Sequence, residues 1–529
     1  MSLALHRTPF FGALLAFCLA VPAANAAQVT LRSLDGSVAM HGELLSFDGE
    51  FYVLEVMLGQ LEVAVNEVIC EGGACPEIIT PDFRMAGSGS LAQVLIPSLF
   101  QGYSDTFDLA LQAGVGTLVG DVPVQPYLFS ASSGALFADV EVTSLDSEAT
   151  FEALLHGDSE IAVASRAITS DELGAFNDAG LGDLTDQIYQ VVAALDGLVV
   201  IVPPENTIAN LSVNELARVF SGGISNWSQL GRANAPINVY RRDDTSGTAR
   251  DFSALVLNPD NAQFSSEATT FTDDVSLVSA VANDPNGIGF ASIAYQQNTR
   301  AVPLRGTCGF ISAPSEFTVK TGEYPLARRI YFYTTNRMFG AIPEEKANKA
   351  LGLLQFVKSN AGQNAAMGSG FVSQSITALP VEVQGQRLVN TMIAEPGDVS
   401  PSSIRAMVSE LSGAIRLSST FRFKPNASEL DAQAHGDIPR LAAYLRGNDF
   451  TGREFLIAGF SDAAGAAEQN ASLSRRRAQQ VLDELQAALG NDAENYDFVA
   501  EGFGEVSPQG CNDSLEGRSV NRRVEIWVR

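Results

Sequence analysis

Near the middle of the sequence, hydroxyl residues and a glycine stand beside two arginines. The stretch Arg241–Phe252 reads RRDDTSGTARDF, and its last part has the apolar spacing of a helix. The first backbone N–H groups of a helix have no partner within it and attract anions, and nearby hydroxyls donate further hydrogen bonds. The guanidinium of Arg242 adds a charge-assisted contact, and we expect Asp244 to orient it. These residues predict a site for a small oxyanion.

Two other stretches place small hydroxyl residues where a helix is expected to begin. GSGS at 87–90 precedes an apolar pattern that starts at Leu91, and SEAT at 147–150 precedes one that starts at Phe151. Any one of these stretches alone is more typical of an ordinary N-cap, because Ser and Thr cap helices in many proteins. Three together, one of them beside Arg242, favour anion binding.

A second set of charged residues lies near the C-terminus. Asp462 follows a strand-like run, and Arg477 falls on the buried stripe of a predicted helix, four residues before Val481. A buried guanidinium needs an anionic partner. A carboxylate of the same domain, such as Asp462 or Glu525, would make a structural ion pair, which the spacing alone favours. In the alternative, a zwitterionic ligand pairs its carboxylate with Arg477 and its ammonium group with Asp462.

The charge balance and the first residues limit the classes of function. The chain has 529 residues, too many for a single core, so roughly two to four domains are expected. A formal net charge of −28 argues against a nucleic acid or an anionic membrane as partner. Residues 1–26 have the basic flank, short apolar core and Ala-Asn-Ala end of a secretory signal peptide. We therefore expect an exported protein with no transmembrane segment in the mature chain.

Four cysteines follow residue 26. Cys70 and Cys75 enclose a tight loop with two glycines, and because export permits disulfides we expect them to be bridged. So short a ring stabilises a fold by only roughly 2 kcal/mol in the loop-entropy model. Cys308 and Cys511 either pair or stay free, and the sequence leaves both alternatives open. No second Cys or His pair accompanies Cys70 and Cys75, so we predict no metal site and no cofactor.

The periodicity of apolar residues divides the remaining chain into four segments. Residues 27–79 alternate apolar and polar positions between glycine-containing turns, which predicts a small all-β barrel or sandwich. Residues 82–378 alternate strand-like and helical runs, which predicts a two-lobed α/β fold with mostly parallel sheets. Residues 379–414 are interpreted as a linker with a short helix, and residues 415–529 as a smaller α+β domain.

The first segment resembles small SH3-like or Sm-like barrels. Many of those bind nucleic acid, but the segment 27–79 has one Arg, no Lys and many acidic residues. This composition favours a structural or protein-contact module.

The segment 82–378 resembles the periplasmic phosphate-binding proteins of ABC transporters (PstS-like). The shared elements are Gly-x-Gly-Ser at 87–90, Ile-Ser-Asn-Trp at 224–227, Arg-x-Asp-x-Ser-Gly-Thr at 242–248 and Gly-Ile-Gly-Phe at 287–290. The resemblance implies a two-lobed binding domain, inorganic phosphate or a similar oxyanion as ligand, and an ABC permease as partner. It implies that the ligand site is formed by Ser90, Leu91, Arg242 with Asp244, Ser246, Gly247 and Thr248, and by Ser147 or Thr150 at the family's second serine position.

One position departs from the family pattern. Many members have an Asp in an Ala-Ser-Asp segment that accepts the proton of hydrogen phosphate, whereas Arg166 follows Ser165 in this sequence. A carboxylate rejects fully deprotonated oxyanions such as sulfate, because it would face their lone pairs. With Arg166 in its place we expect sulfate to compete with phosphate, unless Arg166 points away from the ligand.

The segment 415–529 resembles OmpA-like peptidoglycan-binding domains. The matching elements are Asp462 with Gly465, Asn-x-x-Leu-Ser-x-x-Arg-Ala at 470–478 and Asn-Arg-Arg-Val at 521–524. The resemblance implies that Asp462 and Arg477 hold the amine and the carboxylate of diaminopimelate in the peptide stem. Asn470 and Arg522 complete the implied site. It also implies a Gram-negative periplasm, association with the cell wall, and a place at the outer-membrane side.

No Gly-x-Ser-x-Gly elbow, triad histidine or metal-spaced cluster stands in the segment 82–378, so we predict a binding protein and not an enzyme. The favoured hypothesis is an exported oxyanion-binding protein that is tethered non-covalently to peptidoglycan. The alternative is a structural envelope protein that links the wall to a protein partner and has a degenerate ligand site. Transport, sensing and storage stay open.

Overall fold

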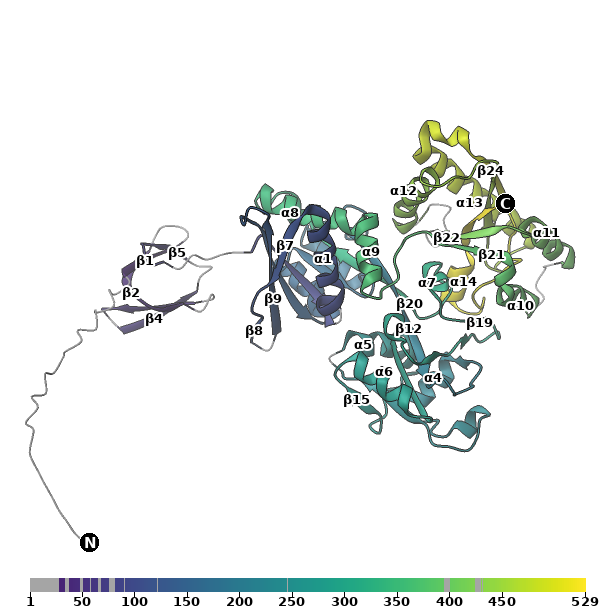
Figure 1. Cartoon of the computed structure of the whole chain (residues 1–529), viewed down its shortest axis with the longest axis horizontal. Helices are drawn as coiled ribbons and strands as arrows, with labels where there is room; N and C mark the ends of the chain where they lie inside the picture. The colour runs from purple at the N-terminus through teal and green to yellow at the C-terminus, as the bar shows by residue number, and fades with distance from the viewer. Residues whose placement is uncertain are drawn as a thin grey trace, which may run out of the picture. The chain divides into compact units, whose positions relative to one another are not determined.

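The computed structural model describes residues 28–33, 38–47, 51–57, 59–64, 68–75, 81–89, 91–120, 122–244, 246–393, 400–423, 430 and 432–529. The chain divides into two compact units, Met1–Thr80 and Pro81–Arg529 (Figure 1). The predicted signal peptide, residues 1–26, lies outside the described residues. Within the described ranges, no helix is both long and apolar enough to cross a lipid bilayer.

The N-terminal unit contains a five-stranded antiparallel sheet with the order β4-β3-β2-β1-β5. Its strands are β1 (Gln28–Ser33), β2 (Ala39–Phe47), β3 (Phe51–Val56), β4 (Gly59–Ala64) and β5 (Val68–Glu71). Alternate residues point to one face of a sheet, so Leu31, Tyr52 and Leu54 form a small core. Cys70 and Cys75 form a disulfide, which confirms the predicted bridge.

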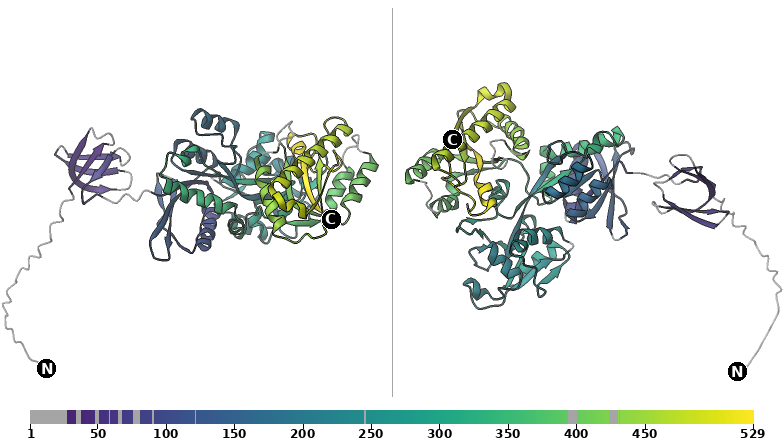
Figure 2. Two further views of the ribbon diagram at one scale, coloured as in Figure 1. Left: turned by 90° about the horizontal axis from the view of Figure 1, so that it is seen from above. Right: turned by 180° about the vertical axis from the view of Figure 1, so that it is seen from behind.

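Lobe 1 of the second unit is a sheet with helices on both faces (Figure 2). Its strands are β6 (Phe83–Ser88), β7 (Leu109–Ala113), β8 (Thr117–Val119), β9 (Val122–Ala131), β10 (Leu136–Leu145) and β11 (Ile161–Ala164). Its helices are η2 (Leu91–Leu95), α1 (Ile96–Phe107), α2 (Ser147–His156), α3 (Ser170–Asp178), η7 (Asn336–Phe339), α8 (Glu344–Lys358) and α9 (Asn360–Gly368). Strand β20 (Ala327–Tyr333) pairs with β11. Along it, Ile330 and Phe332 face α1 and α8, while Tyr331 and Tyr333 face α2 and α3.

Lobe 2 has its own apolar core. Its strands are β13 (Leu211–Ser212), β14 (Asn238–Arg242), β15 (Thr269–Phe271), β16 (Gly287–Ser292), β17 (Arg300–Ala301), β18 (Leu304–Arg305) and β19 (Ile311–Ser312). Its helices are α4 (Val213–Phe220), η3 (Trp227–Leu230), α5 (Gly247–Phe252), η4 (Ser253–Leu257), η5 (Asn258–Asp260), α6 (Asp274–Asn283), η6 (Ile293–Tyr295) and α7 (Glu316–Lys320). The rings of Phe252 and Phe290 stack at 4.0 Å and fix α5 on the sheet.

Two long strands run from one lobe into the other, β12 (Gln190–Val202) and β20 (Ala327–Tyr333) (Figure 1). The first part of β12 pairs with β20, and its second part, Leu198–Ile201, pairs with β16. One sheet therefore continues through both lobes, in the order β15-β14-β16-β12-β20-β11-β6-β10-β9-β7. The expectation of mostly parallel sheets is wrong, because the crossing strands pair antiparallel with their neighbours β11, β16 and each other.

The C-terminal domain is a five-stranded sheet with the order β21-β22-β25-β23-β24. Its strands are β21 (Ala378–Pro380), β22 (Ile415–Arg422), β23 (Glu454–Phe460), β24 (Asp497–Gly502) and β25 (Arg523–Val528). Its helices are η8 (Val381–Val383), α10 (Gly385–Ile393), α11 (Pro401–Leu411), α12 (Ala432–Arg446), α13 (Ala467–Leu489), η9 (Gly490–Asn495) and α14 (Leu515–Asn521). Helices α12 and α13 pack on one face of this sheet, and Met407 and Leu411 of α11 pack with Trp527 on the other.

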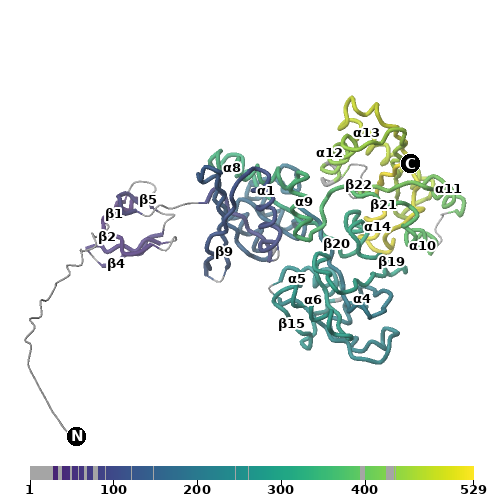
Figure 3. Tube along the Cα trace, in the orientation of Figure 1, coloured from purple at the N-terminus to yellow at the C-terminus, as the bar shows by residue number. Residues whose placement is uncertain are grey.

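The segment 379–414, interpreted from the sequence as a linker, is built into the C-terminal domain. It includes most of β21, which pairs with β22, as well as α10 and α11 (Figure 3). Its proline- and serine-rich part was interpreted as a linker, but Pro401 stands in the first turn of α11. Backbone N–H groups in that turn have no partner within the helix, so a proline there costs no hydrogen bond. Residues 394–399 of this segment lie outside the described residues.

Candidate functional site

The helix start after β6 and the helix start after β14 approach each other where lobe 1 meets lobe 2. Gly89 has a φ of 32°, in the region that favours glycine. A Cβ placed on it would lie 3.6 Å from the backbone nitrogen of Gly247, and a Cβ on Gly247 would lie 3.8 Å from Ser88 Oγ. We call this region the interlobe seam, formed by residues 88–89, 146–147 and 165 of lobe 1 and by residues 242–244 and 246–251 of lobe 2.

On the lobe 1 side, the predicted contact residues differ in what they can offer. Ser90 lies outside the described residues. The side chain of Leu91, at the start of η2, is buried in the core of lobe 1, so only its backbone N–H is available to a ligand. Ser147 is the first residue of α2. Thr150 is fully buried, and its Oγ1 has no hydrogen-bond partner among the residues that the structure describes.

Helix α2 is capped by an acidic residue. Asp146 Oδ1 accepts a hydrogen bond from Ala149 N at 2.9 Å, so this carboxylate already lies at the positive end of the helix. Its Oδ2 lies 3.7 Å from Arg250 Nη1 of α5, across the seam. All three stretches that the sequence analysis selected therefore lie at the seam, although an internal carboxylate occupies the third helix start.

On the lobe 2 side, the Ser-Gly-Thr stretch forms a helix start. Ser246 Oγ accepts a hydrogen bond from Ala249 N at 3.4 Å and so caps α5. Its hydroxyl hydrogen is still able to donate. Gly247 and Thr248 are the first two residues of α5, where backbone N–H groups have no partner within the helix. Helix α5 runs directly into η4, so the helical segment extends to Leu257.

Arg242, at the end of β14, is held by a residue that the sequence analysis missed. Its Nη1 donates to Asp274 Oδ2 at 2.5 Å, and its Nη2 donates to the carbonyl of Thr272 at 2.8 Å. Its Nε is buried with no partner among the described residues. The expected pair with Asp244 is not formed, because Asp244 pairs with Arg241 instead and its side chain is 81% exposed.

A second ion cluster joins the crossing strands to α5. Arg328 of β20 donates to Asp196 of β12 from Nε and Nη2, at 2.9 and 2.6 Å, and from Nη1 to Asp251 of α5. Asp251 Oδ2 also accepts from Ser165 Oγ of lobe 1 at 2.7 Å. Asp251 stands four residues after Gly247, on the same face of the helix, so its place near the seam was detectable in the sequence.

Arg166 points away from Ser165 toward helix α3. Its Nη1 and Nη2 donate to the two carboxylate oxygens of Glu172, at 2.8 and 2.6 Å. Its guanidinium also lies 5.1 Å from the ring centroid of Phe151. The group that is hydrogen-bonded to Ser165 at the seam is the carboxylate of Asp251.

The charged groups near the seam carry no excess of positive charge. The guanidinium groups of Arg242 and Arg328 meet the carboxylates of Asp196, Asp251 and Asp274. Burial raises the pKa of Asp274, against the opposite effect of Arg242 and Arg328. Asp274 Oδ1 is buried with no hydrogen-bond partner among the described residues. An anion at the seam would therefore depend on N–H and O–H dipoles more than on net charge.

In the C-terminal domain, Asp462 forms an ion pair with Arg522. Arg522 Nη1 donates to Asp462 Oδ2 at 2.7 Å, and the backbone N–H of Ala464 donates to Asp462 Oδ1 at 3.0 Å. The structural pair between Asp462 and Arg477 that the spacing favours is not among these contacts. Arg522, which the family resemblance included in the site, is thus the residue that fixes Asp462.

Arg477 and Asn470 lie on α13, near this ion pair. Arg477 is buried, and its guanidinium carbon lies 4.9 Å from the ring centroid of Phe423. Burial and the nearby charge of Arg522 lower the pKa of Arg477. Asn470 Nδ2 donates to Glu505 Oε2 at 2.9 Å, so Asn470 holds the loop after β24. The arrangement places two guanidinium groups and one carboxylate together, which suits a ligand with its own carboxylate.

Comparison with known families identifies two domains. Residues 123–361 match the sequence model of the PBP superfamily domain, and residues 422–522 match that of the OmpA family. Both matches lie inside the segments in which the sequence motifs were found. The chain thus carries a PBP superfamily domain followed by an OmpA family domain, as the motifs predict.

Each of the similar proteins covers only part of this chain. Phosphate-binding protein PstS of Borreliella burgdorferi is 26% identical over 218 residues, covering 40% of this chain and 72% of that protein. Protein SphX of Synechococcus elongatus is 29% identical over 226 residues, and here the match spans 40% of this chain and less than two thirds of SphX, 63%. An ABC-type phosphate transport receptor from Vibrio cholerae aligns at 20% identity over 55% of this chain and 99% of that chain, with a TM-score of 0.41.

Proposed function

We propose that this protein binds phosphate, or an oxyanion of the same shape, at the interlobe seam. The observation that carries the proposal is the approach of Gly89 to Gly247, which brings two helix starts with hydroxyl residues together. Similarity to phosphate-binding proteins supports the proposal. Since these relatives are named for binding, the chain is a binding protein and not an enzyme. An ABC permease is the expected partner if the protein serves transport.

The proposed ligand is held mainly by neutral donors. The backbone N–H groups of Leu91, Gly247 and Thr248 and the hydroxyl of Ser246 supply hydrogen bonds, and Arg242 supplies its free Nε. Ligand entry requires the two lobes to separate at the seam, since Ser165 and Asp251 are hydrogen-bonded across it. Such hinge motion is usual for two-lobed binding proteins.

Asp251 gives the proposed site a preference for a protonated oxyanion. Its carboxylate lies beside Ser165, where it is able to accept a hydrogen bond from the O–H of hydrogen phosphate. Sulfate has no proton at neutral pH, and it would place lone pairs against this carboxylate. The expectation that sulfate competes well, which depended on Arg166, is therefore replaced by the expectation that phosphate is preferred.

Calorimetric titration of the full chain with phosphate and with sulfate tests this function. We expect phosphate to bind and sulfate to bind at least about tenfold more weakly, a difference of about 1.4 kcal/mol. No heat of binding and no ligand-dependent rise in melting temperature with phosphate would contradict the proposal.

We further propose that the C-terminal domain attaches the protein to peptidoglycan in the periplasm, on the outer-membrane side. The match to the OmpA family and the group formed by Asp462, Arg477 and Arg522 support this role. The carboxylate of a diaminopimelate residue would meet the arginines, and its ammonium group would meet Asp462. Co-sedimentation of the purified protein with isolated sacculi tests the attachment.

One observation favours a second function. Arg242, Arg328 and Arg166 each have a carboxylate partner from the protein itself. A PBP-like domain whose arginines are satisfied internally could serve as a contact platform between the wall and another envelope protein. The phosphate titration separates the two functions, since only the first predicts binding.

A further inference from the structure

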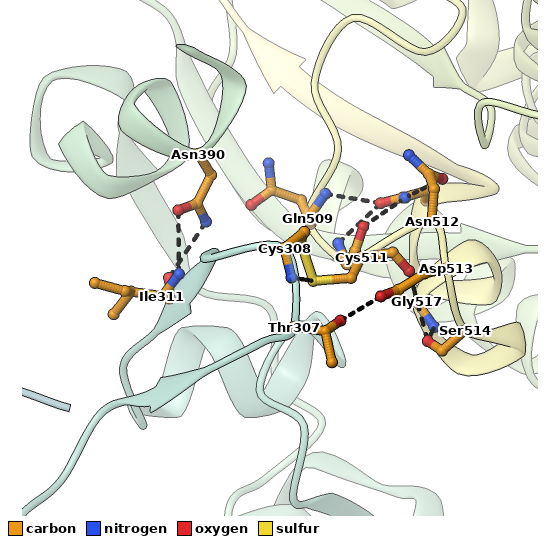
Figure 4. Close-up of a disulfide and its surroundings, with 12 residues drawn as sticks. Thr307, Cys308, Ile311, Asn390, Gln509, Cys511, Asn512, Asp513, Ser514 and Gly517 are labelled. Atoms are coloured by element: carbon orange, nitrogen blue, oxygen red, sulfur yellow. Dashed lines mark hydrogen bonds between the residues drawn. A yellow bond between two sulfur atoms is a disulfide. The ribbon is translucent and has the colours of Figure 1, made fainter. Parts of the chain in front are cut away.

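Lobe 2 is joined covalently to the C-terminal domain. Cys308, between β18 and β19, forms a disulfide with Cys511, which lies 203 residues later in the loop before α14 (Figure 4). Beside it, Thr307 Oγ1 donates to Asp513 Oδ2 at 2.6 Å (Figure 4). Neither the sequence motifs nor the two matched families assign a function to this bond.

A buried ion cluster joins the same two bodies at a second place. Arg416 of β22 donates to Glu323, which follows α7 of lobe 2, at 2.6 Å, and it lies 3.1 Å from Glu525. Glu525 Oε1 also pairs with Arg387 Nη1 of α10 at 2.8 Å and with Arg523 Nε at 2.6 Å. The side chains of Arg416, Arg523 and Glu525 are at most 1% exposed. Separating lobe 2 from the domain would remove Glu323 from this cluster and expose charges that now neutralise one another.

Two further sets of hydrogen bonds lie between these places. Asn390 of α10 donates from Nδ2 to the carbonyl of Ile311, and its Oδ1 accepts from the N–H of Ile311, both at 3.2 Å (Figure 4). Arg422 Nη2 donates to the carbonyls of Thr321 and Gly322, at 2.8 and 3.2 Å. The contacts thus extend from residue 307 to residue 323 of lobe 2. Because they are spread over this segment, they restrain both translation and rotation of lobe 2 relative to the C-terminal domain.

The loop that carries Cys511 also borders the candidate wall site. Asn512 Oδ1 accepts from the N–H of Ala463, the residue after Asp462, at 3.3 Å. Asn521 Nδ2 donates to the same Asn512 oxygen at 2.9 Å, and Arg522 follows Asn521. The disulfide therefore connects lobe 2 to the part of the C-terminal domain that presents Asp462 and Arg522.

We propose that lobe 2 and the C-terminal domain form one rigid body, fastened by the Cys308–Cys511 disulfide and the buried ion cluster, and that the seam opens by movement of lobe 1. Lobe 1 is joined to this body through the crossing strands β12 and β20 and through residues 369–377, which run from α9 to β21, so the hinge consists of three chain segments. In a wall-attached protein, lobe 2 is then the fixed lobe. The wall attachment and the ligand-linked motion of lobe 1 rest on the proposed function, whereas the rigid body does not.

Distances between spin labels test the rigid body in the full chain. Labels are attached to an encoded ketone amino acid, so that the native cysteines stay intact, at exposed helix positions: Gln355 of lobe 1, Ser279 of lobe 2 and Ala487 of the C-terminal domain. We expect one narrow distance distribution between positions 279 and 487, with the same mean before and after addition of inorganic phosphate. We expect the distances from position 355 to both other positions to change when phosphate is added.

Removal of the disulfide tests its part in the body. In the double variant Cys308→Ser with Cys511→Ser, we expect the distribution between positions 279 and 487 to broaden. The matched control Cys70→Ser with Cys75→Ser removes the other disulfide and should leave that distribution narrow. A distribution in the variant as narrow as in the unaltered protein would overturn the role of the disulfide.

A broad distribution between positions 279 and 487 in the unaltered, oxidised protein would overturn the rigid body itself. So would a shift of that distance on phosphate addition as large as the shift between positions 355 and 279. These measurements on the unaltered protein need no cysteine variant to fold. If phosphate changes none of the distances and gives no heat of binding, the proposed function fails, while the width of the distribution between 279 and 487 still decides the rigid body.

Discussion

At the scale of single residues, the candidate oxyanion site depends on how Arg242 is shared between Asp274 and a ligand. Two of its nitrogens are used by Asp274 and by the carbonyl of Thr272, and its Nε is buried with no partner among the described residues. Since an unpaired buried donor is unfavourable, a ligand that accepts from Nε would gain from a group that is already positioned. The carboxylate of Asp274 thus fixes the guanidinium of Arg242 in a position from which Nε could donate to an anion.

Replacing Arg242 with Ala should weaken phosphate binding by about 1.5–3 kcal/mol, about tenfold to a hundredfold in Kd. The same change leaves the carboxylate of Asp274 buried without its ion pair, so the melting temperature should fall as well. Calorimetry and thermal unfolding measure the two effects. In the double variant Arg242→Ala with Asp274→Asn, stability should recover in part while phosphate binding stays weak. Recovery of binding in that variant would show that Arg242 acts only through Asp274.

Replacing Asp251 with Asn should reduce the preference for phosphate over sulfate. Asn presents an N–H as well as a carbonyl oxygen, so it no longer repels the lone pairs of sulfate. Competition of sulfate against phosphate measures the change. The matched variant Arg166→Gln should leave the preference unchanged, because Arg166 is held by Glu172. If Arg166→Gln alters the preference and Asp251→Asn does not, the acceptor has been assigned to the wrong residue.

Replacing Asp462 with Ala should abolish co-sedimentation with sacculi. The ion pair with Arg522 is partly exposed, so we expect the loss of stability to stay at about 1–3 kcal/mol. The exposed pair of Arg475 and Glu501 in the same domain offers a control, and Glu501→Ala should bind sacculi normally. Retained co-sedimentation of the Asp462 variant, together with a large fall in melting temperature, would make the pair structural.

The candidate site residues that the sequence indicated are those that lie close together in the chain. Arg242 ends β14 and Gly247 begins α5, so the residues that led to the prediction of an anion site are close together in the sequence. The partners of the arginines come from separate elements: Asp274 begins α6, and Asp196 and Arg328 face each other on neighbouring strands. A single sequence contains no signal for such pairs, because they depend on sheet order and register.

At the scale of elements, the buried ion cluster on β25 makes the stability of the fold depend on pH. Glu525 is fully buried on this strand and is shared by Arg387, Arg416 and Arg523. Burial alone would raise the pKa of Glu525, but these three arginines lower it well below its usual value. A carboxylate with a lowered pKa stabilises the fold above its unfolded-state pKa of about 4.3, and this contribution is lost as the pH falls further.

Replacing Glu525 with Gln should therefore destabilise the protein at neutral pH by about 3–5 kcal/mol, because three buried guanidinium groups lose a shared partner. The difference in melting temperature from the unaltered protein should shrink as the pH falls from 7 toward 3. Thermal unfolding at a series of pH values measures this. The exposed Glu382 provides a control, and Glu382→Gln should change neither the stability nor its pH dependence. A difference that stays constant with pH would mean that the pKa of Glu525 is the same in the folded and the unfolded protein.

The apolar periodicity of the sequence predicted the alternation of strands and helices in residues 82–378, since buried helices and strands carry that pattern. It could not predict that β21 and α10, in the segment interpreted as a linker, belong to the C-terminal domain. Strand β21 has three residues, too few to show a period, and Arg387 of α10 is a charged residue that is buried in an ion pair with Glu525. The contact that decides the assignment lies 138 residues away in the sequence.

At the scale of the whole molecule, the two proposed binding sites lie on parts of the chain that are joined in different ways. If lobe 2 and the C-terminal domain form one body, wall attachment leaves lobe 1 free to move. The affinity for phosphate should then be the same, within about twofold, with and without saturating soluble peptidoglycan fragments, which corresponds to a coupling free energy below about 0.4 kcal/mol. Calorimetric titration in both conditions measures it. A larger change in affinity would show that the wall site restrains lobe 1.

The order of the disulfides along the chain has a consequence for biosynthesis. Of the four cysteines after residue 26, the first two form one disulfide, Cys70–Cys75, and the last two form the other, Cys308–Cys511. A chain that is exported from its N-terminus presents the thiols in this same order, so stepwise oxidation during export produces the native pairs without later isomerisation. Cys308, however, must wait for the 203 residues that separate it from Cys511. In a chain that is exported from its N-terminus, this disulfide therefore closes only after the C-terminal domain has arrived.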